Sequence, residues 1–225
     1  MTIKHWPESE RPQEKLLRCG AKSLSDAELL ALFIRSGTPG RTAIDIGRDL
    51  LNEFGGLRQI LTADRRHLYR ISGCGPARYA LLHASLELNR RFLDQTLRKH
   101  GPLNSPQQAA DFLTHQLRDL KREVFAVLYL DTRHQVIDYE ELFCGTLNGA
   151  TVHPREVVRS VIEHNASAVI LAHNHPSGVA EPSQSDAILT RRLRESLGLI
   201  DVRLLDHLVI GDGECVSMSD RGYLD

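Results

Sequence analysis

The sequence predicts a mixed α/β domain preceded by a small all-α domain, and two observations lead to this fold class. Helical spacing of apolar residues dominates up to Leu93, and strand patterns begin only after the Gly- and Pro-rich segment 99–106. The formal charge changes sign at the same place: residues 1–100 hold 17 Lys and Arg against 11 Asp and Glu (+6), whereas residues 101–225 hold 11 against 18 (−7). We therefore predict two domains, over residues 1–100 and 101–225.

The N-terminal domain is predicted to consist of short helices separated by glycine-containing turns. The first helix opens at the cap Ser25, has an acidic first turn, and stops at the segment 37–40. The next helix ends at Gly55, and two more helices flank the turn 71–76. The helices after the first cover about residues 42–53, 64–69 and 77–91.

The turn 71–76, with a glycine on each side of Cys74, resembles a helix-hairpin-helix. In that family the glycine turn and the following helix present backbone N–H groups to a nucleic-acid phosphate. The resemblance implies DNA contact that is independent of sequence and sensitive to salt. The alternative is a structural hairpin that uses glycine for close packing. The candidate contact residues are Gly73, Gly75 and Arg78, with Arg65 and Arg66 beside them.

The C-terminal domain is predicted to mix strands with helices, which indicates a sheet covered by helices. Its first helix is capped by Ser105 and has Pro106 at its first position. The run 168–172 is short, apolar and rich in β-branched residues, which is typical of a buried strand. Strands are predicted near 124–130, 135–144, 168–172, 202–210 and 214–218, and helices near 106–117, 155–165 and 184–197.

A candidate metal site follows the strand 168–172. His173 and His175 stand two residues apart where this strand ends, and Asp186 lies in the first turn of the next helix. Two imidazoles and a carboxylate suit Zn²⁺, and a site with three protein ligands keeps a position open, as catalytic zinc sites do. Manganese, iron or cobalt are further candidates. The alternative is a chance pair of histidines in a chain that has 11 of them.

The run His173 to Gly178, followed by Pro182, Ser183 and Asp186, resembles the JAMM motif of the JAB/MPN metalloproteases. The segments 145–147 and 154–156 are similar to the bacterial RadC (UPF0758) branch of that family. The resemblance implies a mixed-sheet JAB/MPN-like fold with cytidine-deaminase-like layering. It also implies one Zn²⁺ held by His173, His175 and Asp186.

The resemblance further implies a zinc-dependent hydrolase of the metallopeptidase or isopeptidase type. In such an enzyme zinc-bound water attacks an amide carbonyl of a peptide or protein substrate, Glu123 is the general base, and Ser183 donates to the oxyanion. Glu156 competes with Glu123 for the role of base. Glu123 is also explained as an exposed glutamate at a strand start, and Glu156 by a favourable interaction with the dipole of the helix that it opens. Asn174 stands where many isopeptidases have Ser or Thr between the histidines, and this departure bears on the substrate.

Asp206 and His207 form a second polar pair on the predicted strand 202–210. Histidines that bind a metal usually donate their other ring N–H to a carboxylate or carbonyl, so Asp206 is a candidate partner for one of them. The alternative is an acid at the edge of the core beside a histidine bonded to backbone.

The rest of the composition favours a cytoplasmic protein. The four cysteines are scattered without a C-x-x-C pair, which argues against a disulfide scaffold, a zinc ribbon and a zinc deaminase. No run is long enough to span a membrane, and the first residues lack the apolar core of a signal peptide. The alternative function is a DNA-associated protein of recombination or repair whose metal domain is structural or binds a partner.

Overall fold

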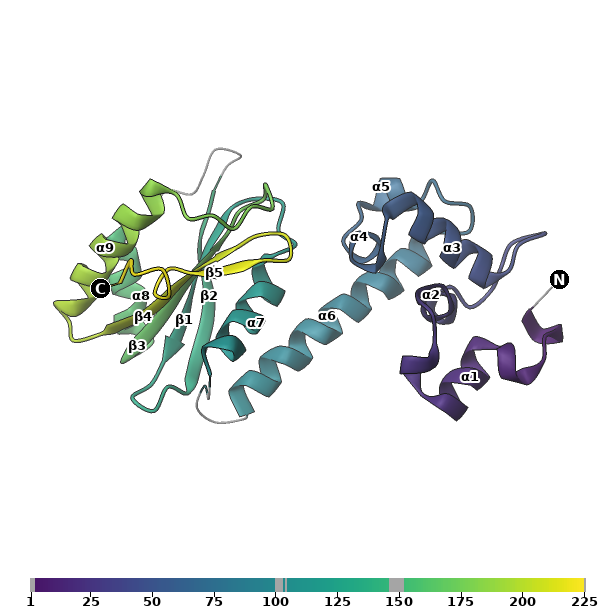
Figure 1. Ribbon diagram of the computed structural model, residues 1–225, viewed down its shortest axis with the longest axis horizontal. Coiled ribbons are helices and arrows are strands. Elements are labelled where there is room, and N and C mark those ends of the chain that lie inside the picture. The colour runs from purple at the N-terminus through teal and green to yellow at the C-terminus, as the bar shows by residue number, and fades with distance from the viewer. Residues whose placement is uncertain (1–2, 100–102, 104, 146–151, 225) are drawn as a thin grey trace. The chain divides into compact units, whose positions relative to one another are not determined.

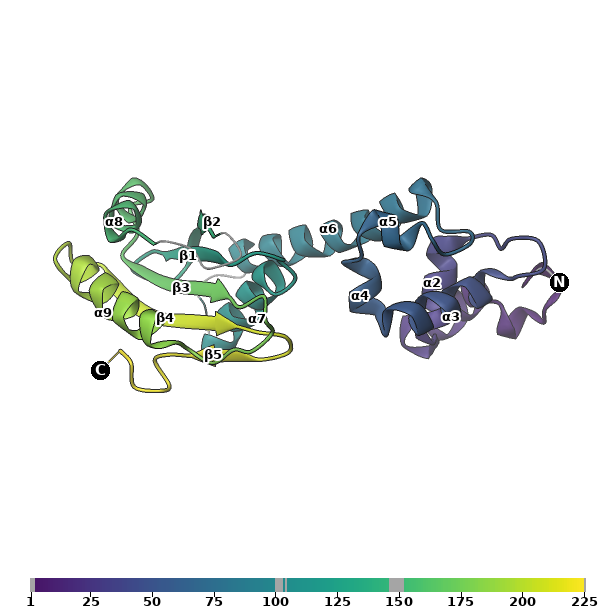
Figure 2. The same cartoon turned by 90° about the horizontal axis from the view of Figure 1, so that it is seen from above.

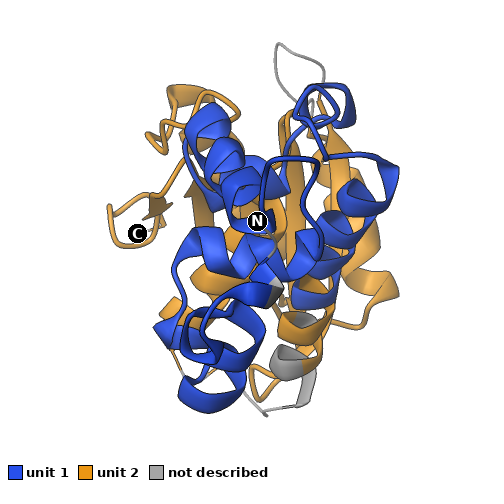
Figure 3. Cartoon of the chain, turned by 90° about the vertical axis from the view of Figure 1, so that its right-hand side faces the viewer, with its two compact units in different colours: residues 1–89 blue, residues 90–225 orange. Residues whose placement is uncertain are grey.

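The computed structural model describes residues 3–99, 103, 105–145 and 152–224. The chain divides into two compact units, which we call unit 1 (residues 1–89) and unit 2 (residues 90–225) (Figure 3). The division falls inside the helix α6 (Pro76–Lys99), so the boundary predicted near residue 100 lies at the end of that helix. Of the segments that carry the family resemblance, Thr146 and Leu147 lie outside the described residues.

Unit 1 is helical, as predicted (Figure 1). The capping residue Ser25 opens α2, where its hydroxyl accepts the N–H of Glu28 and the Glu28 carboxylate accepts the N–H of Ser25. Thr42 and Asp45 repeat this reciprocal arrangement at the start of α3. The helices are α1 (Pro12–Cys19), α2 (Asp26–Ile34), α3 (Ala43–Phe54), α4 (Leu57–Leu61), α5 (Arg65–Leu68) and the first part of α6, with 3₁₀ turns at Ile3–His5, Glu8–Glu10 and Ala21–Ser23.

Gly73 and Gly75, which flank the turn before α6, have different surroundings. Gly73 has φ +88°, and a Cβ there would lie 2.7 Å from Arg78 Nη1 and 2.9 Å from Ile46 Cδ1. A Cβ on Gly75 would meet no atom within 4 Å, and the φ of Gly75 is not positive. Gly73 is therefore required for close packing of the hairpin, as the structural alternative proposed, whereas Gly75 is not.

Replacing Gly73 with alanine is therefore expected to lower the free energy of unfolding of unit 1 by about 1–3 kcal/mol, the usual cost of forcing a side chain into this backbone region. Gly75→Ala is the matched control and is expected to change it by at most about 1 kcal/mol, the cost of alanine at the N-cap of α6. Urea unfolding of both variants measures the difference. Equal stability of the two would contradict the packing role of Gly73.

Unit 2 contains a five-stranded mixed sheet with the strand order β2-β1-β3-β4-β5. β3 and β4 are parallel, and the other neighbouring pairs are antiparallel. α7 packs on one face of the sheet, and α8 and α9 pack on the other (Figure 2). This mixed α/β fold confirms the predicted class. The elements are α7 (Pro106–Leu117), β1 (Val124–Leu130), β2 (Val136–Cys144), α8 (Pro154–Glu163), β3 (Ala168–Asn174), α9 (Gln184–Gly198), β4 (Arg203–Ile210) and β5 (Cys215–Ser217).

The register of the sheet decides which residues reach the candidate site. Phe125, the second residue of β1, pairs with His173 near the end of β3, so the start of β1 lies beside the predicted metal ligands. Side chains alternate between the faces of a strand. On β3, Val169 and Leu171 face α8 and α9, whereas Ala172 faces α7. His173 therefore belongs to the face of α8 and α9.

Two further findings concern the whole described chain. Cys19, Cys74, Cys144 and Cys215 are free thiols. No helix among the described residues is both long and apolar enough to cross a bilayer.

Candidate metal centre

His173 and His175 bring two ring nitrogens together at the carboxyl end of β3. His173 is 2% exposed, whereas the side chain of His175 retains 21% of its surface, so the site is reached from the side of His175. The Nδ1 of His175 lies 2.8 Å from the main-chain oxygen of Val179. Because a carbonyl oxygen can only accept, this Nδ1 carries the proton and the Nε2 of neutral His175 presents a lone pair to the site.

Asp186 reaches the histidines from the first turn of α9. The helix begins at Ser183, whose N–H donates to Asp186 Oδ2 (2.7 Å) and whose hydroxyl accepts the N–H of Asp186 (3.1 Å). Burial acts to raise the pKa of the Asp186 carboxyl, whereas its hydrogen bonds with Ser183 act to lower that pKa. These bonds hold the carboxylate at the start of α9.

The three predicted ligands lie close enough together to hold a single ion. His173 Nε2 lies 3.1 Å from His175 Nε2 and 3.4 Å from Asp186 Oδ1, and His175 Nε2 lies 3.9 Å from Asp186 Oδ2. Bonds of about 2.0–2.1 Å to a tetrahedral zinc separate neighbouring ligand atoms by about 3.3 Å. One ligand atom from each residue lies within 4.8 Å of the other two, so the cluster can hold a metal ion.

Ser183, the predicted oxyanion donor, is exposed and caps α9. Its oxygen accepts the N–H of Asp186, and its hydroxyl also forms a hydrogen bond with the Asp186 carboxylate. The structure thus gives Ser183 a helix-capping role next to Asp186.

Glu123, the predicted general base, directly precedes β1, and its main-chain oxygen accepts the N–H of Gly145 (2.8 Å). The side chain of Asn174 binds the residues on both sides of Glu123. Asn174 Oδ1 accepts the N–H of Val124 (2.8 Å), and its Nδ2 donates to the main-chain oxygens of Arg122 and Leu120 (3.1 Å each). Asn174 therefore fastens the backbone around Glu123 to the end of β3.

Asn174 is 1% exposed, and its carboxamide is bonded to backbone. The substitution that sets this chain apart from many isopeptidases therefore has a structural explanation. The sequence alone connected Asn174 with the substrate. It does not reveal the structural role, because the main-chain groups that Asn174 binds lie 50–54 residues earlier in the chain.

Glu156, the competing candidate for the base, lies in the first turn of α8. Its carboxylate is 3.2 Å from Arg155 Nε and 2.6 Å from Arg159 Nη2. These ion pairs and the positive end of the α8 dipole account for a carboxylate at this position. The geometry thus favours the local explanation for Glu156.

The predicted contact between Asp206 and a metal-binding histidine is wrong. Asp206 pairs with Ile170 on the α7 face of the sheet, where it lines a cavity of about 250 Å³. Its carboxylate accepts the N–H groups of His207 (2.7 Å) and Ser219 (3.0 Å) and the hydroxyl of Ser217 (2.6 Å). Asp206 is thus satisfied on the opposite side of the sheet from His173.

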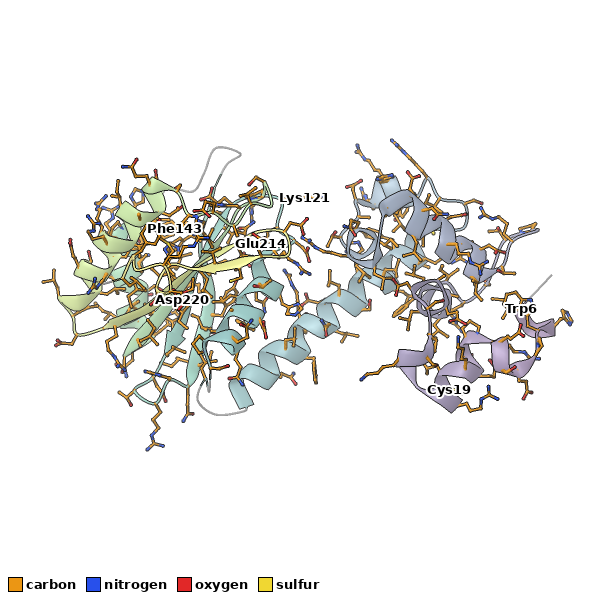
Figure 4. All side chains as sticks on the ribbon, viewed as in Figure 1. Trp6, Cys19, Lys121, Phe143, Glu214 and Asp220 are labelled. Atoms are coloured by element: carbon orange, nitrogen blue, oxygen red, sulfur yellow. The ribbon has the colours of Figure 1, made fainter. Side chains whose placement is uncertain are left out.

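His207, the next residue, holds the position that was predicted for Asp206. Its Nε2 lies 2.9 Å from His173 Nδ1, and its Nδ1 lies 2.6 Å from Thr190 Oγ1. The ring of Phe125 packs edge-on against His207 (5.6 Å) and against Phe143 (6.2 Å), which Figure 4 labels. Burial in this apolar environment lowers the pKa of His207 well below its usual value, so the ring is neutral.

Arg78 does not take up the phosphate-facing position that was predicted for it in unit 1. Its Nε donates to the main-chain oxygen of Ile34 (3.1 Å), and its Nη2 donates to the main-chain oxygen of Ser36 and to the Ser36 hydroxyl. Arg78 therefore ties the start of α6 to the end of α2. Arg65 and Arg66, in contrast, are exposed on α5.

The fold and the site together define a class, the α/β domains of the JAB type with a His-His-Asp cluster that can hold a metal ion. Residues 103–223 match the family model described as a RadC-like JAB domain, and residues 3–80 match the model described as UPF0758 N-terminal. The chain belongs to the UPF0758 family, which confirms the resemblance seen in the sequence.

Relatives share this organisation over their full length. UPF0758 proteins from Marinobacter nauticus and Aeromonas hydrophila are 56% and 57% identical to this chain over 224 residues, which is 100% of each chain. The UPF0758 protein from Alcanivorax borkumensis is 58% identical over 222 residues, or 99% of each chain.

Proposed function

We propose that unit 2 is a zinc-dependent hydrolase that cleaves amide bonds in a peptide or protein substrate. The observation that carries the proposal is the convergence of two imidazole nitrogens and one carboxylate within 4.8 Å at the open end of β3. Three protein ligands are typical of catalytic zinc, whereas structural zinc is usually held by four. The match to a JAB domain supports the same class of chemistry.

A zinc ion held by His173, His175 and Asp186 would supply a Lewis acid and lower the pKa of a coordinated water to about 7. Glu123 is the proposed general base: its carboxylate accepts the proton of the attacking water and returns it to the leaving amine. Ser183 is the proposed donor to the developing oxyanion, because its hydroxyl is exposed and lies at the start of α9 beside Asp186.

The experiment that tests this function uses protein stripped of metal and then reloaded with zinc. Both forms are incubated with a peptide library and with isopeptide-linked lysine substrates, and the products are identified by mass spectrometry. We expect cleavage only after zinc is restored, and none by a His175→Ala variant. Zinc-loaded protein that cleaves none of these substrates, or metal-free protein that cleaves them equally well, would refute the proposal.

Asn174 offers a prediction about the position of the base. Replacing it with serine removes the partners of one buried N–H and two main-chain oxygens around Glu123. The free energy of unfolding is therefore expected to fall by at least about 1–3 kcal/mol. Because the same bonds fix the backbone of Glu123, turnover should fall while zinc content is retained. Chemical denaturation and zinc analysis measure both effects. The control is Asn52→Ser on the exposed surface of α3, and equal stability of the two variants would disprove the role of Asn174.

A second candidate function, sequence-independent DNA binding by unit 1, is favoured by one observation. Arg65, Arg66 and Arg70 are all exposed and lie within the ten residues before Gly75. Cations grouped in this way attract the phosphate backbone, and such binding weakens steeply as salt increases.

We expect the protein to bind duplex and single-stranded DNA at low salt. The slope of the logarithm of the binding constant against the logarithm of the salt concentration should become less steep by about two when Arg65 and Arg66 are both changed to glutamine. Arg155→Gln in unit 2, equally exposed to solvent, should leave the slope unchanged. Fluorescence anisotropy over a salt series provides the measurement. Failure to bind DNA even at low salt would exclude this second function.

A further inference from the structure

We infer that Thr190 and His207 form a buried hydrogen-bond chain that fixes which ring nitrogen of His173 faces the metal centre. The inference deepens the proposed metal site and rests on it for the identity of the bound group. Both residues are 0% exposed, and neither lies among the three candidate ligands. They are positioning residues, since they act on the site only through His173 and Asp186.

The proton of the Thr190 hydroxyl determines the direction of the chain. Thr190 Oγ1 lies 2.6 Å from the main-chain oxygen of Asp186, one helical turn earlier in α9, and 2.6 Å from His207 Nδ1. A carbonyl oxygen has no proton, so the hydroxyl must donate to it, since otherwise two oxygen lone pairs would face each other. The sulfur of Met218, 3.5 Å from the same hydroxyl, is also only an acceptor. Thr190 therefore accepts from His207.

The direction of this bond sets the protonation of both histidines. A neutral imidazole has one N–H, so if His207 donates from Nδ1, its Nε2 is an acceptor. The partner of that Nε2, at 2.9 Å, is His173 Nδ1, which must then carry a proton. Neutral His173 is left with a lone pair on Nε2, and this nitrogen points at His175 and Asp186.

The chain produces an arrangement that is repulsive unless a cation is present. His173 Nε2 and His175 Nε2 both present lone pairs and lie only 3.1 Å apart, and the Asp186 carboxylate faces them. Three electron-rich atoms that converge in this way are stabilised by a cation between them. Thr190 and His207 thus prepare the site for metal before any metal arrives.

The same chain couples two of the ligands to each other. It starts at the main-chain oxygen of Asp186 on α9, passes through Thr190 to His207 on β4, and ends at His173 on β3. Partners of this kind orient metal ligands, and their removal typically lowers metal affinity by about 10–100-fold. Without the Thr190 hydroxyl, His207 is free to adopt the other tautomer. His173 would then hold its proton on Nε2, where the metal would have to displace it.

The test uses the full-length chain with Thr190→Val, Thr190→Ser and His207→Phe, together with Thr62→Val as the matched control. The hydroxyl of Thr62 also donates to the main-chain oxygen four residues earlier (Arg58, 3.0 Å), but in unit 1. Two quantities are measured: the zinc dissociation constant by competition with a chelator, and the ¹⁵N shifts of His173 in metal-free protein, which report its tautomer.

We expect metal-free wild type to carry the His173 proton on Nδ1. Zinc binding should weaken by about 10–100-fold in His207→Phe and by about 10-fold in Thr190→Val, and it should stay near the wild-type value in Thr190→Ser and Thr62→Val. The inference is overturned if folded Thr190→Val and His207→Phe both bind zinc within about twofold of wild type. It is also overturned if His173 in metal-free wild type is protonated on Nε2.

Failure of this inference can be distinguished from failure of the proposed hydrolase function. Zinc binding that depends on Thr190 and His207 without amide cleavage would refute the hydrolase and support the chain. If wild type takes up no zinc, the tautomer of His173 alone decides the inference. Should His207→Phe fail to fold, Thr190→Val is still compared with Thr190→Ser. The serine variant retains the hydroxyl in a slightly smaller side chain, whereas the valine variant lacks it.

Discussion

Glutamine in place of Glu123 is expected to lower turnover by about 10²–10⁴-fold while zinc content stays at the wild-type level. The two side chains have nearly the same shape, but a carboxamide cannot accept the proton that a general base must take. Glu123 is not one of the three residues whose ligand atoms converge, so its replacement leaves the donor set intact. Zinc analysis and cleavage kinetics on the same preparation separate the two effects.

The matched control for this prediction is Glu156→Gln. Glu156 is paired with Arg155 and Arg159 at the start of α8, so its loss is expected to affect local stability but not the chemical step. Two results would count against Glu123 as the base: loss of zinc in Glu123→Gln, or an active Glu123→Gln beside an inactive Glu156→Gln.

Removing the side chain of Asp186 is expected to abolish metal binding and also to weaken the start of α9. In Asp186→Ala, the site loses a carboxylate ligand, and the N–H of Ser183 loses its acceptor. A capping interaction of this kind contributes about 0.3–1.5 kcal/mol. Zinc at 100 times its dissociation constant should stabilise the wild type by about 2.7 kcal/mol and the variant not at all.

Asp45→Ala provides the control for the loss of helix capping in Asp186→Ala. Asp45 occupies the equivalent position in the capping box of α3, where it accepts the N–H of Thr42, and it belongs to unit 1 and is not one of the candidate metal ligands. We expect Asp45→Ala to lose a similar capping energy but to keep its zinc and its stabilisation by zinc. Thermal unfolding with and without zinc compares the three proteins. Stabilisation of Asp186→Ala by zinc to the wild-type extent would show that Asp186 is not a ligand.

The parts of the structure that the sequence predicted correctly depend on short-range patterns. Strand β1 and the first five residues of β3 are continuous apolar runs, and the helix starts at Ser25 and Ser183 follow from capping residues three positions before an acid. The candidate ligands also lie within 14 residues of one another along the chain, between His173 and Asp186. Local chemistry therefore sufficed to predict the elements and the cluster.

The incorrect predictions concern contacts between segments that are distant in sequence. The register of β4 against β3 shifts between Val169 and Ile170, so that Ile170 pairs with Asp206 and not with Leu205. This irregularity changes which residues face the site, and no periodic pattern in the sequence reveals it. Arg78 was misread for a related reason, because its partners Ile34 and Ser36 lie more than 40 residues earlier.

The central claim, a catalytic metal centre with three protein ligands, is tested most directly by anomalous X-ray diffraction at the zinc edge from crystals of protein purified without added metal. We expect one anomalous peak within about 2.0–2.2 Å of His173 Nε2, His175 Nε2 and a carboxylate oxygen of Asp186, with no fourth protein ligand. A zinc ion closed off by a fourth side chain would contradict it by making the site structural. A zinc peak elsewhere on the chain, with none at these residues, would contradict it as well.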